Sequence, residues 1–213
     1  MTQILVCRCE EGIVLASDSR AVVYPSQEEK DRRFIHVKKV FQLGSRTVAV
    51  AAGAGYGTLL CEGLERHLLE MDLDHYAAIA GEAPRFLQAQ LDGLRKNQPR
   101  GIVPDELNRF FLVIAGHAPG GEMDPFRFLL LGVEGPEGDV RVIPTGSVVA
   151  VPRHMGAEYR LVRFHPDAGG LNSVEAFLEE LLVWMARKNE EIGAPFHFTR
   201  ITQEGISTRT RWR

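Results

Sequence analysis

The sequence is poor in cysteine. The number and the spacing of its cysteines speak against a disulfide framework and against a metal finger. There are three cysteines among 213 residues, which is an odd number. Cys7 and Cys9 are two positions apart, a spacing too tight for the usual zinc or redox pairs. We interpret the cysteines as core thiols of a protein from a reducing compartment.

The sequence also lacks long apolar runs and a large excess of charge of either sign. No segment approaches the length needed to cross a bilayer, and the opening MTQILVCRCEEG has no basic leader. The formal net charge of -3 gives no surplus of Lys and Arg for a polyanion. We therefore expect a cytoplasmic protein with no nucleic-acid partner and no membrane partner.

Motifs for metals and nucleotides are missing as well. The seven histidines are scattered, and none forms a ligand pair at helical spacing. The segment GAGYG follows an apolar run but lacks the full GxGxxG spacing of a phosphate loop. No metal and no other cofactor is expected.

The first fifty residues are predicted to be β. Residues 2–9 alternate apolar and polar and are followed by the Glu11-Gly12 turn and a second apolar run, which is typical of a hairpin. Residues 34–43 and 47–53 read as two further strands around a turn at Gly44-Ser45.

The remainder alternates between helices and strands within one domain, 1–213. Leucines at helical spacing predict helices after Gly57 and over 76–94, and Asn172 or Ser173 could cap a third helix that runs through Asn189. Strands are expected at 110–116, 126–133, 140–144, 147–151, 196–201 and 206–212. The two strands of 140–151 would meet across a short turn at 145–146. This order predicts antiparallel sheets covered by helices, with the first strand in the middle of the protein.

Thr2 is the first candidate for chemistry. Removal of Met1 would leave Thr2 with a hydroxyl and a free α-amine on one residue. The amine, with an ordinary pKa of about 8, could take the hydroxyl proton directly or through a water. Thr2 would then supply both the nucleophile and its base.

Two longer segments carry a resemblance to a known family. TQILVCRCEEGIVLASDSRA, continued by HVKKVFQLGSRTVAVAAG, resembles the opening of proteasome β subunits and of the eubacterial proteasome-like peptidases. The resemblance implies an α+β fold of the N-terminal nucleophile hydrolase type, a four-layer αββα sandwich with two antiparallel sheets. It also implies four catalytic positions, which fall here on Thr2, Asp18, Lys39 and Gly53.

Each implied residue has a physical task. The ammonium of Lys39 would lower the free energy of the alkoxide of Thr2. Asp18 would keep this ammonium charged and directed toward Thr2. The Gly53 N–H would face the carbonyl oxygen that becomes negative during attack. Arg20 is expected to organise the surroundings of the site.

The same resemblance places a substrate groove beside these residues. Ala21, Val22, Ala51 and Gly55 are expected to line it, and the small Ala51 would leave an open apolar specificity pocket.

Three positions depart from the pattern that the resemblance implies. Asn189 and Ile192 stand where an Asp and a Ser would support the terminal amine and Lys39. An earlier Ser falls on Arg153 without a gap, or on Thr145 or Ser147 in a shifted register. Ile192 can neither donate nor accept a hydrogen bond from its side chain.

The function expected first is a threonine-type endopeptidase that assembles into a ring or barrel and admits unfolded polypeptide or peptide substrates, with an ATPase as a possible partner. The alternatives are a catalytically silent structural or regulatory subunit and an amidohydrolase on the same fold. Thr2, Asp18 and Lys39 favour activity, whereas Arg153, Asn189 and Ile192 favour the silent subunit.

Overall fold

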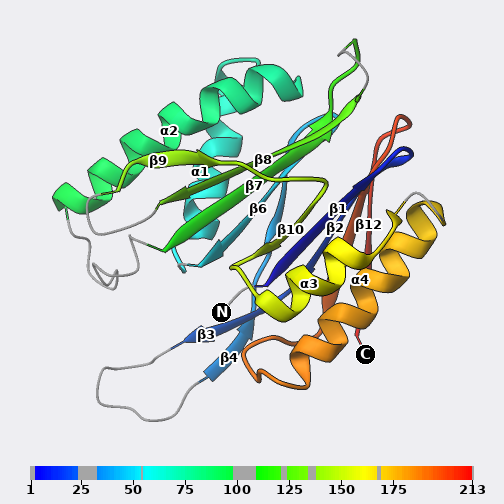
Figure 1. The fold of residues 1–213 in the computed structure, drawn as a ribbon. Coiled ribbons are helices and arrows are strands. Elements are labelled where there is room, and N and C mark those ends of the chain that lie inside the picture. The colour runs from blue at the N-terminus through cyan, green and yellow to red at the C-terminus, as the bar shows by residue number, and fades with distance from the viewer. Residues whose placement is uncertain are drawn as a thin grey trace.

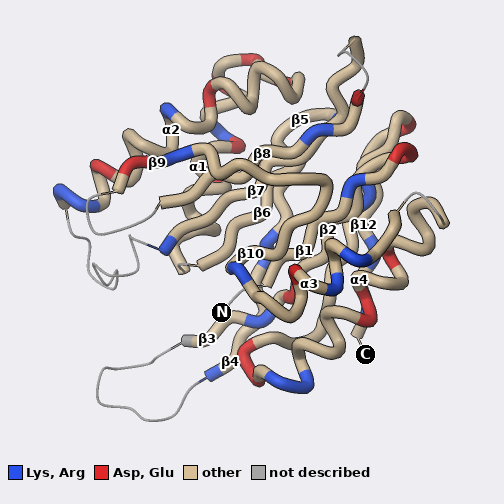
Figure 2. Tube along the Cα trace, viewed as in Figure 1, with Lys and Arg blue, Asp and Glu red and all other residues tan. Residues whose placement is uncertain are grey.

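The chain forms four layers in a computed structural model that describes residues 3–23, 33–53, 55–97, 109–120, 124–133, 138–166 and 169–212. Figure 1 shows two sheets stacked against each other, with one pair of helices over the outer face of each. Figure 2 shows basic and acidic segments interspersed along the helices on both outer faces.

The first sheet contains the first and the last strand of the chain that the structure describes. Its five strands pair antiparallel in the order β10-β1-β2-β11-β12. Their bounds are β1 Ile4–Cys9, β2 Gly12–Asp18, β10 Val148–Val151, β11 Phe196–Ile201 and β12 Ile206–Arg211. As expected, the N-terminal strand is interior, because β10 and β2 flank it.

The second sheet follows chain order, and a small separate ribbon stands beside it. Its strands pair in the order β5-β6-β7-β8-β9, all antiparallel. Their bounds are β5 Val40–Gly44, β6 Thr47–Gly53, β7 Phe110–His117, β8 Phe126–Val133 and β9 Val140–Ile143. The ribbon is formed by β3 Arg20–Val23 and β4 Arg33–His36.

Four helices cover the sheets through their apolar faces. Their bounds are α1 Gly57–Glu70, α2 Tyr76–Asn97, α3 Met155–Arg163 and α4 Gly170–Ala186. Helices α1 and α2 pack on the β5–β9 sheet, and α3 and α4 pack on the sheet that contains β1. A third core, which includes Ile4, Leu15, Val50 and Val113, fills the space between the two sheets.

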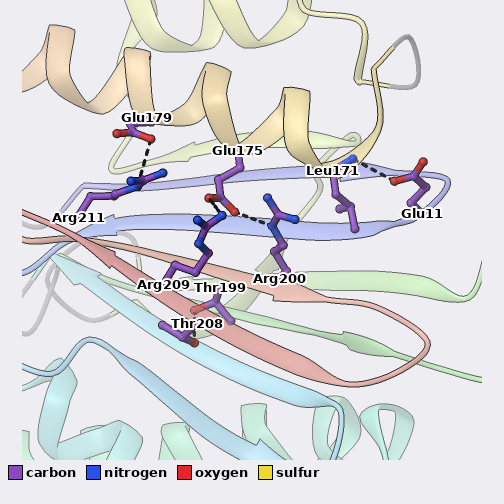
Figure 3. A network of polar contacts seen from close by, with 9 residues as sticks. All are labelled: Glu11, Leu171, Glu175, Glu179, Thr199, Arg200, Thr208, Arg209 and Arg211. Carbon is purple, nitrogen blue, oxygen red and sulfur yellow. Dashed lines mark hydrogen bonds and ion pairs between the residues drawn. The ribbon is translucent and has the colours of Figure 1, made fainter.

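One acidic residue in the α4 layer is almost completely buried and holds two strands of the first sheet. Glu175 accepts hydrogen bonds from Arg200 Nε at 2.5 Å and from Arg209 Nη1 at 3.3 Å (Figure 3). Because Arg200 lies on β11 and Arg209 on β12, this carboxylate ties the C-terminal hairpin to the helix above it.

The expected run of strand over 34–43 is wrong. The structure ends β4 at His36, leaves 37–39 outside any strand and begins β5 at Val40. The physical reason is long-range, because Lys39 turns into the protein to reach Asp18 and the carbonyl of Arg20.

The expected hairpin turn at 145–146 is also wrong. Strand β9 pairs with β8, whereas β10 pairs with β1 in the other sheet, so this segment crosses between sheets. Helix α4 begins at Gly170 after Gly169, rather than after Asn172 or Ser173, and it ends at Ala186. Strand β3 and helix α3 were not expected.

Two features are absent from the residues that the structure describes. None of the described helices is long and apolar enough to cross a membrane. Within the same residues, no group of three or more His, Cys, Asp or Glu side chains is placed to hold a metal ion. All three cysteines are described and buried, and none forms a disulfide.

Candidate active site

Asp18 is the centre of a buried polar cluster at the end of β2. Its Oδ1 atom accepts a hydrogen bond from Lys39 Nζ at 2.9 Å and another from the backbone N–H of Gln3 at 2.9 Å. Gln3 and Asp18 are 15 positions apart, and the antiparallel pairing of β1 with β2 brings them together. One carboxylate oxygen therefore joins the start of the chain to Lys39.

Burial sets the electrostatics of this pair. The side chain of Asp18 is 0% exposed and that of Lys39 is 3% exposed. Burial raises the pKa of Asp18, and the charge of Lys39 and the Gln3 N–H oppose that rise. Burial likewise lowers the pKa of Lys39, and the charge of Asp18 opposes it. Each charge therefore depends on the other.

The position of Lys39 is fixed by two acceptors on one side. Besides Asp18, its Nζ atom donates to the carbonyl oxygen of Arg20 at 2.7 Å. The neighbouring chain is held as well, because Val37 N donates to the carbonyl of Ser19 at 2.9 Å. These contacts explain why strand geometry stops before Lys39 and resumes at Val40.

The carboxylate of Asp18 has a second oxygen with a different environment. Asp18 Oδ2 is buried and has no hydrogen-bond partner among the residues that the structure describes. Thr2, the predicted nucleophile, lies outside the described residues, directly before Gln3. The described part of the site therefore reaches the residue that follows Thr2.

Gly53 ends β6 in a conformation that favours glycine. Its φ is +96°, and a Cβ atom built there would lie 1.8 Å from the carbonyl oxygen of Arg109. In the ladder, Gly53 is opposite Phe110 of β7. Both the backbone angle and the close approach of β7 therefore require glycine at this position.

The residues predicted to line a groove lie in three different environments. Ala21 and Val22 are half-buried on β3, opposite Ile35 and Phe34 of β4. Ala51 is buried in the core beneath α1. Gly55 is exposed, with no atom within 4 Å of a Cβ built on it.

Asn189 and Ile192 have structural roles in the turn that follows α4. Asn189 Oδ1 accepts a hydrogen bond from Glu191 N at 3.0 Å, and Ile192 N donates to the carbonyl of Asn189 at 3.1 Å. The Ile192 side chain is 4% exposed and belongs to the core beneath α4.

Arg20 connects this turn to the buried cluster. Its Nη1 atom donates to the carbonyl of Glu190 at 2.6 Å, and its own carbonyl accepts from Lys39. A Cβ atom at Gly193 would come within 2.3 Å of the Arg20 guanidinium carbon, so glycine makes room for this contact.

Arg153 lies on the surface and pairs with a neighbour on α3. Its Nε and Nη2 atoms donate to the two carboxylate oxygens of Glu158, both at 3.1 Å. The side chain is 86% exposed. The preceding residue is nearer the cluster, because the carbonyl of Pro152 accepts from Gln3 Nε2 at 3.2 Å.

The structure also brings together residues that sequence reasoning left apart. Ser19, His36 and His197 line one cleft together with Lys39. The scattered histidines of the sequence gave no reason to expect a role for His36 or His197. Strand alternation offered one signal, because His197, Thr199 and Ile201 share the face of β11 that points toward the second sheet.

The fold defines the class of the chain. The expected α+β fold, an αββα sandwich with two antiparallel sheets, is confirmed by the layers and pairings above, and it is that of N-terminal nucleophile hydrolases. No family model matches the chain, and no curated protein matches it.

Two similar solved structures are both of Anbu from Hyphomicrobium sp. strain MC1. A mutant form of that protein superposes with a TM-score of 0.71 at 16% identity, over 99% of this chain and 87% of that one. A second Anbu structure gives a TM-score of 0.68 at 16% identity, over 98% and 86%. At this identity the similarity shows the fold alone.

The family expected from the sequence needs correction. We expected a member of the proteasome β-subunit and eubacterial proteasome-like peptidase family, on the opening segments of the chain. That assignment is wrong, because no such family model matches and the similar structures are those of Anbu. The N-terminal nucleophile hydrolase fold stands without it.

Proposed function

We propose that this chain is an amide hydrolase that uses Thr2 as its nucleophile after removal of Met1, and that its substrates are peptide bonds in unfolded chains. One observation carries the proposal. The buried Asp18–Lys39 pair shares its oxygen Oδ1 with the N–H of Gln3, the residue directly after Thr2. This places a buried ion pair beside the residue that would react, where its charge can stabilise a developing negative charge on Thr2.

The first chemical step is a proton transfer within Thr2. The free α-amine takes the hydroxyl proton, directly or through a water, while Oγ attacks the substrate carbonyl carbon. The ammonium of Lys39 lowers the free energy of the developing alkoxide, and Asp18 keeps that ammonium protonated in spite of burial.

The second step breaks the amide bond. The carbonyl oxygen becomes negative as the Oγ–C bond forms, and we assign the N–H of Gly53 to it as hydrogen-bond donor. The C–N bond then breaks, and the leaving amine carries away the proton held by the Thr2 amine. Water hydrolyses the resulting ester, which releases the carboxylic acid and restores Thr2.

The test begins with the intact mass of the protein from its native cell, which should correspond to loss of Met1. An electrophilic peptide, such as a peptide vinyl sulfone, should then add once per chain, on Thr2. Thr2→Ser should retain labelling and slow peptide cleavage, and Thr2→Ala should lose both. A mass that includes Met1 throughout would overturn the proposal.

A second candidate function is a catalytically silent subunit, and two observations favour it. Ile192 is packed into the core beneath α4, and the amide oxygen of Asn189 is used within its own turn. Ile192 has no polar side-chain atom and Asn189 has no carboxylate with which to support a terminal amine. The labelling experiment separates the two functions, because a silent subunit can lose Met1 yet will not react with the electrophile.

We also propose that the chain assembles into a ring. Large apolar side chains are exposed on both outer layers, with Leu59 and Leu69 on α1 and Met155 and Val162 on α3. Such side chains are typical of surfaces that pack against other chains. The mass in solution by light scattering tests this directly, and a monomer at working concentration would contradict it. An ATPase that delivers unfolded chains is the partner such a ring would need.

A further inference from the structure

A cleft opens where the edges of the two sheets face each other. Strand β12 is the last strand of the first sheet, and β5 is an edge strand of the second. The cleft has a volume of about 580 Å³, and its lining comes from β5 and β12, from the neighbouring strands β6 and β11, from Ser19, and from residues 36–39, which lead into β5. It shares Lys39 with the buried Asp18 pair, and it goes beyond the site proposed for amide hydrolysis.

The polar lining of this cleft is rich in donors. It consists of Ser19, His36, Lys38, Lys39, Gln42, His197 and Thr208. Among the described residues that line the cleft, none carries a carboxylate. The lining therefore offers hydrogen-bond donors to a ligand that supplies acceptors.

Both imidazoles are held by hydroxyl groups through their Nδ1 atoms. Ser19 Oγ lies 3.1 Å from His36 Nδ1, and Thr210 Oγ1 lies 3.2 Å from His197 Nδ1. When a hydroxyl donates to Nδ1, the neutral ring carries its hydrogen on Nε2, and the protonated ring carries one there too. Each ring thus keeps an Nε2–H donor in these states.

The surroundings of His197 lower the pKa of its side chain. Burial lowers the pKa of His197, the charges of Lys39 and His36 lower it further, and only Asp18 raises it. Lys38 does not add to these charges, because its ammonium lies over the ring of Phe41, which packs in the core beneath α1 and α2. A bound anion would add a second negative charge besides that of Asp18 and would raise the pKa of His197.

The rest of the lining is aliphatic. It consists of Val37, Val40, Val48 and Ile206, which lie beside the polar groups. A bare inorganic anion would leave these side chains without contacts, whereas an organic acid would use both parts of the cleft.

From this combination we propose that the cleft between β5 and β12 binds a carboxylate that carries an aliphatic group, with His36 and His197 as donors. The carboxylate could belong to a small organic acid or to the C-terminal residue of a peptide. The recognising chemistry is the same, and the experiment distinguishes the two sources.

The test is NMR titration of the histidine side chains in wild type and in the Thr2→Ala variant, in which no turnover is expected. Hexanoate should shift the signals of His36 and His197 and raise the pKa of His197, and hexanamide should do neither.

A second comparison identifies the source of the carboxylate. Acetyl-Ala-Ala-Leu with a free carboxylate is compared with its C-terminal amide. Tighter binding of this peptide than of hexanoate identifies a chain terminus, and the reverse identifies a small acid.

Matched variants locate the site. His197→Gln should weaken the binding of hexanoate about tenfold, the loss of one charge-assisted hydrogen bond. His36→Gln, on the exposed ribbon, repeats the test if His197→Gln perturbs the fold. His67→Gln is the control, because His67 pairs with Glu82 between α1 and α2. Equal binding of hexanoate and hexanamide, or unchanged binding in both cleft variants, would overturn the proposal.

Discussion

Lys39 Nζ lies 2.9 Å from Asp18 Oδ1, and neither side chain is more than 3% exposed. Few ion pairs are this well shielded from solvent, because removing two charges from water is unfavourable unless they are well paired. The pair is completed by two backbone groups, the Gln3 N–H on Asp18 and the Arg20 carbonyl on Lys39. This pair therefore links the start of β1, the end of β2, the start of β3 and the segment before β5.

Asp18→Asn should lower both stability and activity. Without the carboxylate, the buried ammonium of Lys39 loses its partner and its pKa falls further below the ordinary value. We expect a loss of about 3–5 kcal/mol in the free energy of unfolding, which is usual when one charge of a buried pair is removed and the other stays buried without a partner. Urea unfolding measures it, and peptide cleavage should fall to background in the same variant.

The double variant Asp18→Asn with Lys39→Met is the control for this prediction. If the single losses reflect an unpaired buried charge, the double variant should lose clearly less stability than the two single variants added together. Additive losses would show that the pair is not coupled.

Gly53→Ala should be severely destabilising, whereas Gly55→Ala should be tolerated. A methyl group at Gly53 meets the Arg109 carbonyl and forces an L-residue to a φ of +96°, while a methyl group at Gly55 meets nothing within 4 Å. We expect a loss of about 3 kcal/mol or more for the first and less than about 0.5 kcal/mol for the second. Thermal unfolding of the two variants side by side tests this, and similar melting temperatures would contradict it.

Glu175 should contribute more to stability than Glu179, which lies one helical turn further along α4. Glu175 is buried and holds both Arg200 and Arg209, whereas Glu179 is partly exposed and lies 3.7 Å from Arg211 (Figure 3). Glu175→Gln should lower the free energy of unfolding by about 2 kcal/mol because Arg200 loses its charged partner.

The matched variant for this prediction is Glu179→Gln, for which we expect about 0.5 kcal/mol or less, as for other exposed pairs. Chemical unfolding under the same conditions compares the two variants. Equal losses would mean that burial of Glu175 adds nothing to the pair.

The elements that local periodicity decides were predictable from the sequence. The alternation in 2–9 and the leucine spacing after Gly57 gave β1 and α1 close to their observed bounds. Helix α3 was missed, because only Ala157 and Leu161 of its nine residues are buried. These two residues pack in the core beside α4, and the Arg160 guanidinium stacks over the ring of Trp184 of α4.

The candidate site shows the same limit. Asp18, Lys39 and Gly53 were singled out by a resemblance in the opening segments, yet the break that turns Lys39 inward depends on acceptors about twenty positions away. The pairing of β10 with β1 likewise depends on residues more than 140 positions apart, such as Leu5 and Ala150. No local pattern carries that information.

Asp74 should stabilise the protein at neutral pH and lose this effect in acid. Its carboxylate accepts hydrogen bonds from Ser45 Oγ and Ser45 N, both at 2.6 Å, which join the start of α2 to the β5–β6 turn. These two bonds lower the pKa of Asp74 below its ordinary value of 3.8. A carboxyl group whose pKa is lowered by folding contributes its stability above 3.8, and that stability disappears as the pH falls through the folded-state pKa.

Asp74→Ala should therefore lower the free energy of unfolding by about 1 kcal/mol at neutral pH, as expected for hydrogen bonds at an exposed site. The difference from wild type should shrink as the pH falls below 3.8, because wild type then loses the ionised form. Ser45→Ala removes one donor and keeps the backbone N–H, so it should show roughly half the loss with the same pH dependence. Urea unfolding at a series of pH values measures both, and a loss that stays constant into acid would show that the charge of Asp74 plays no part.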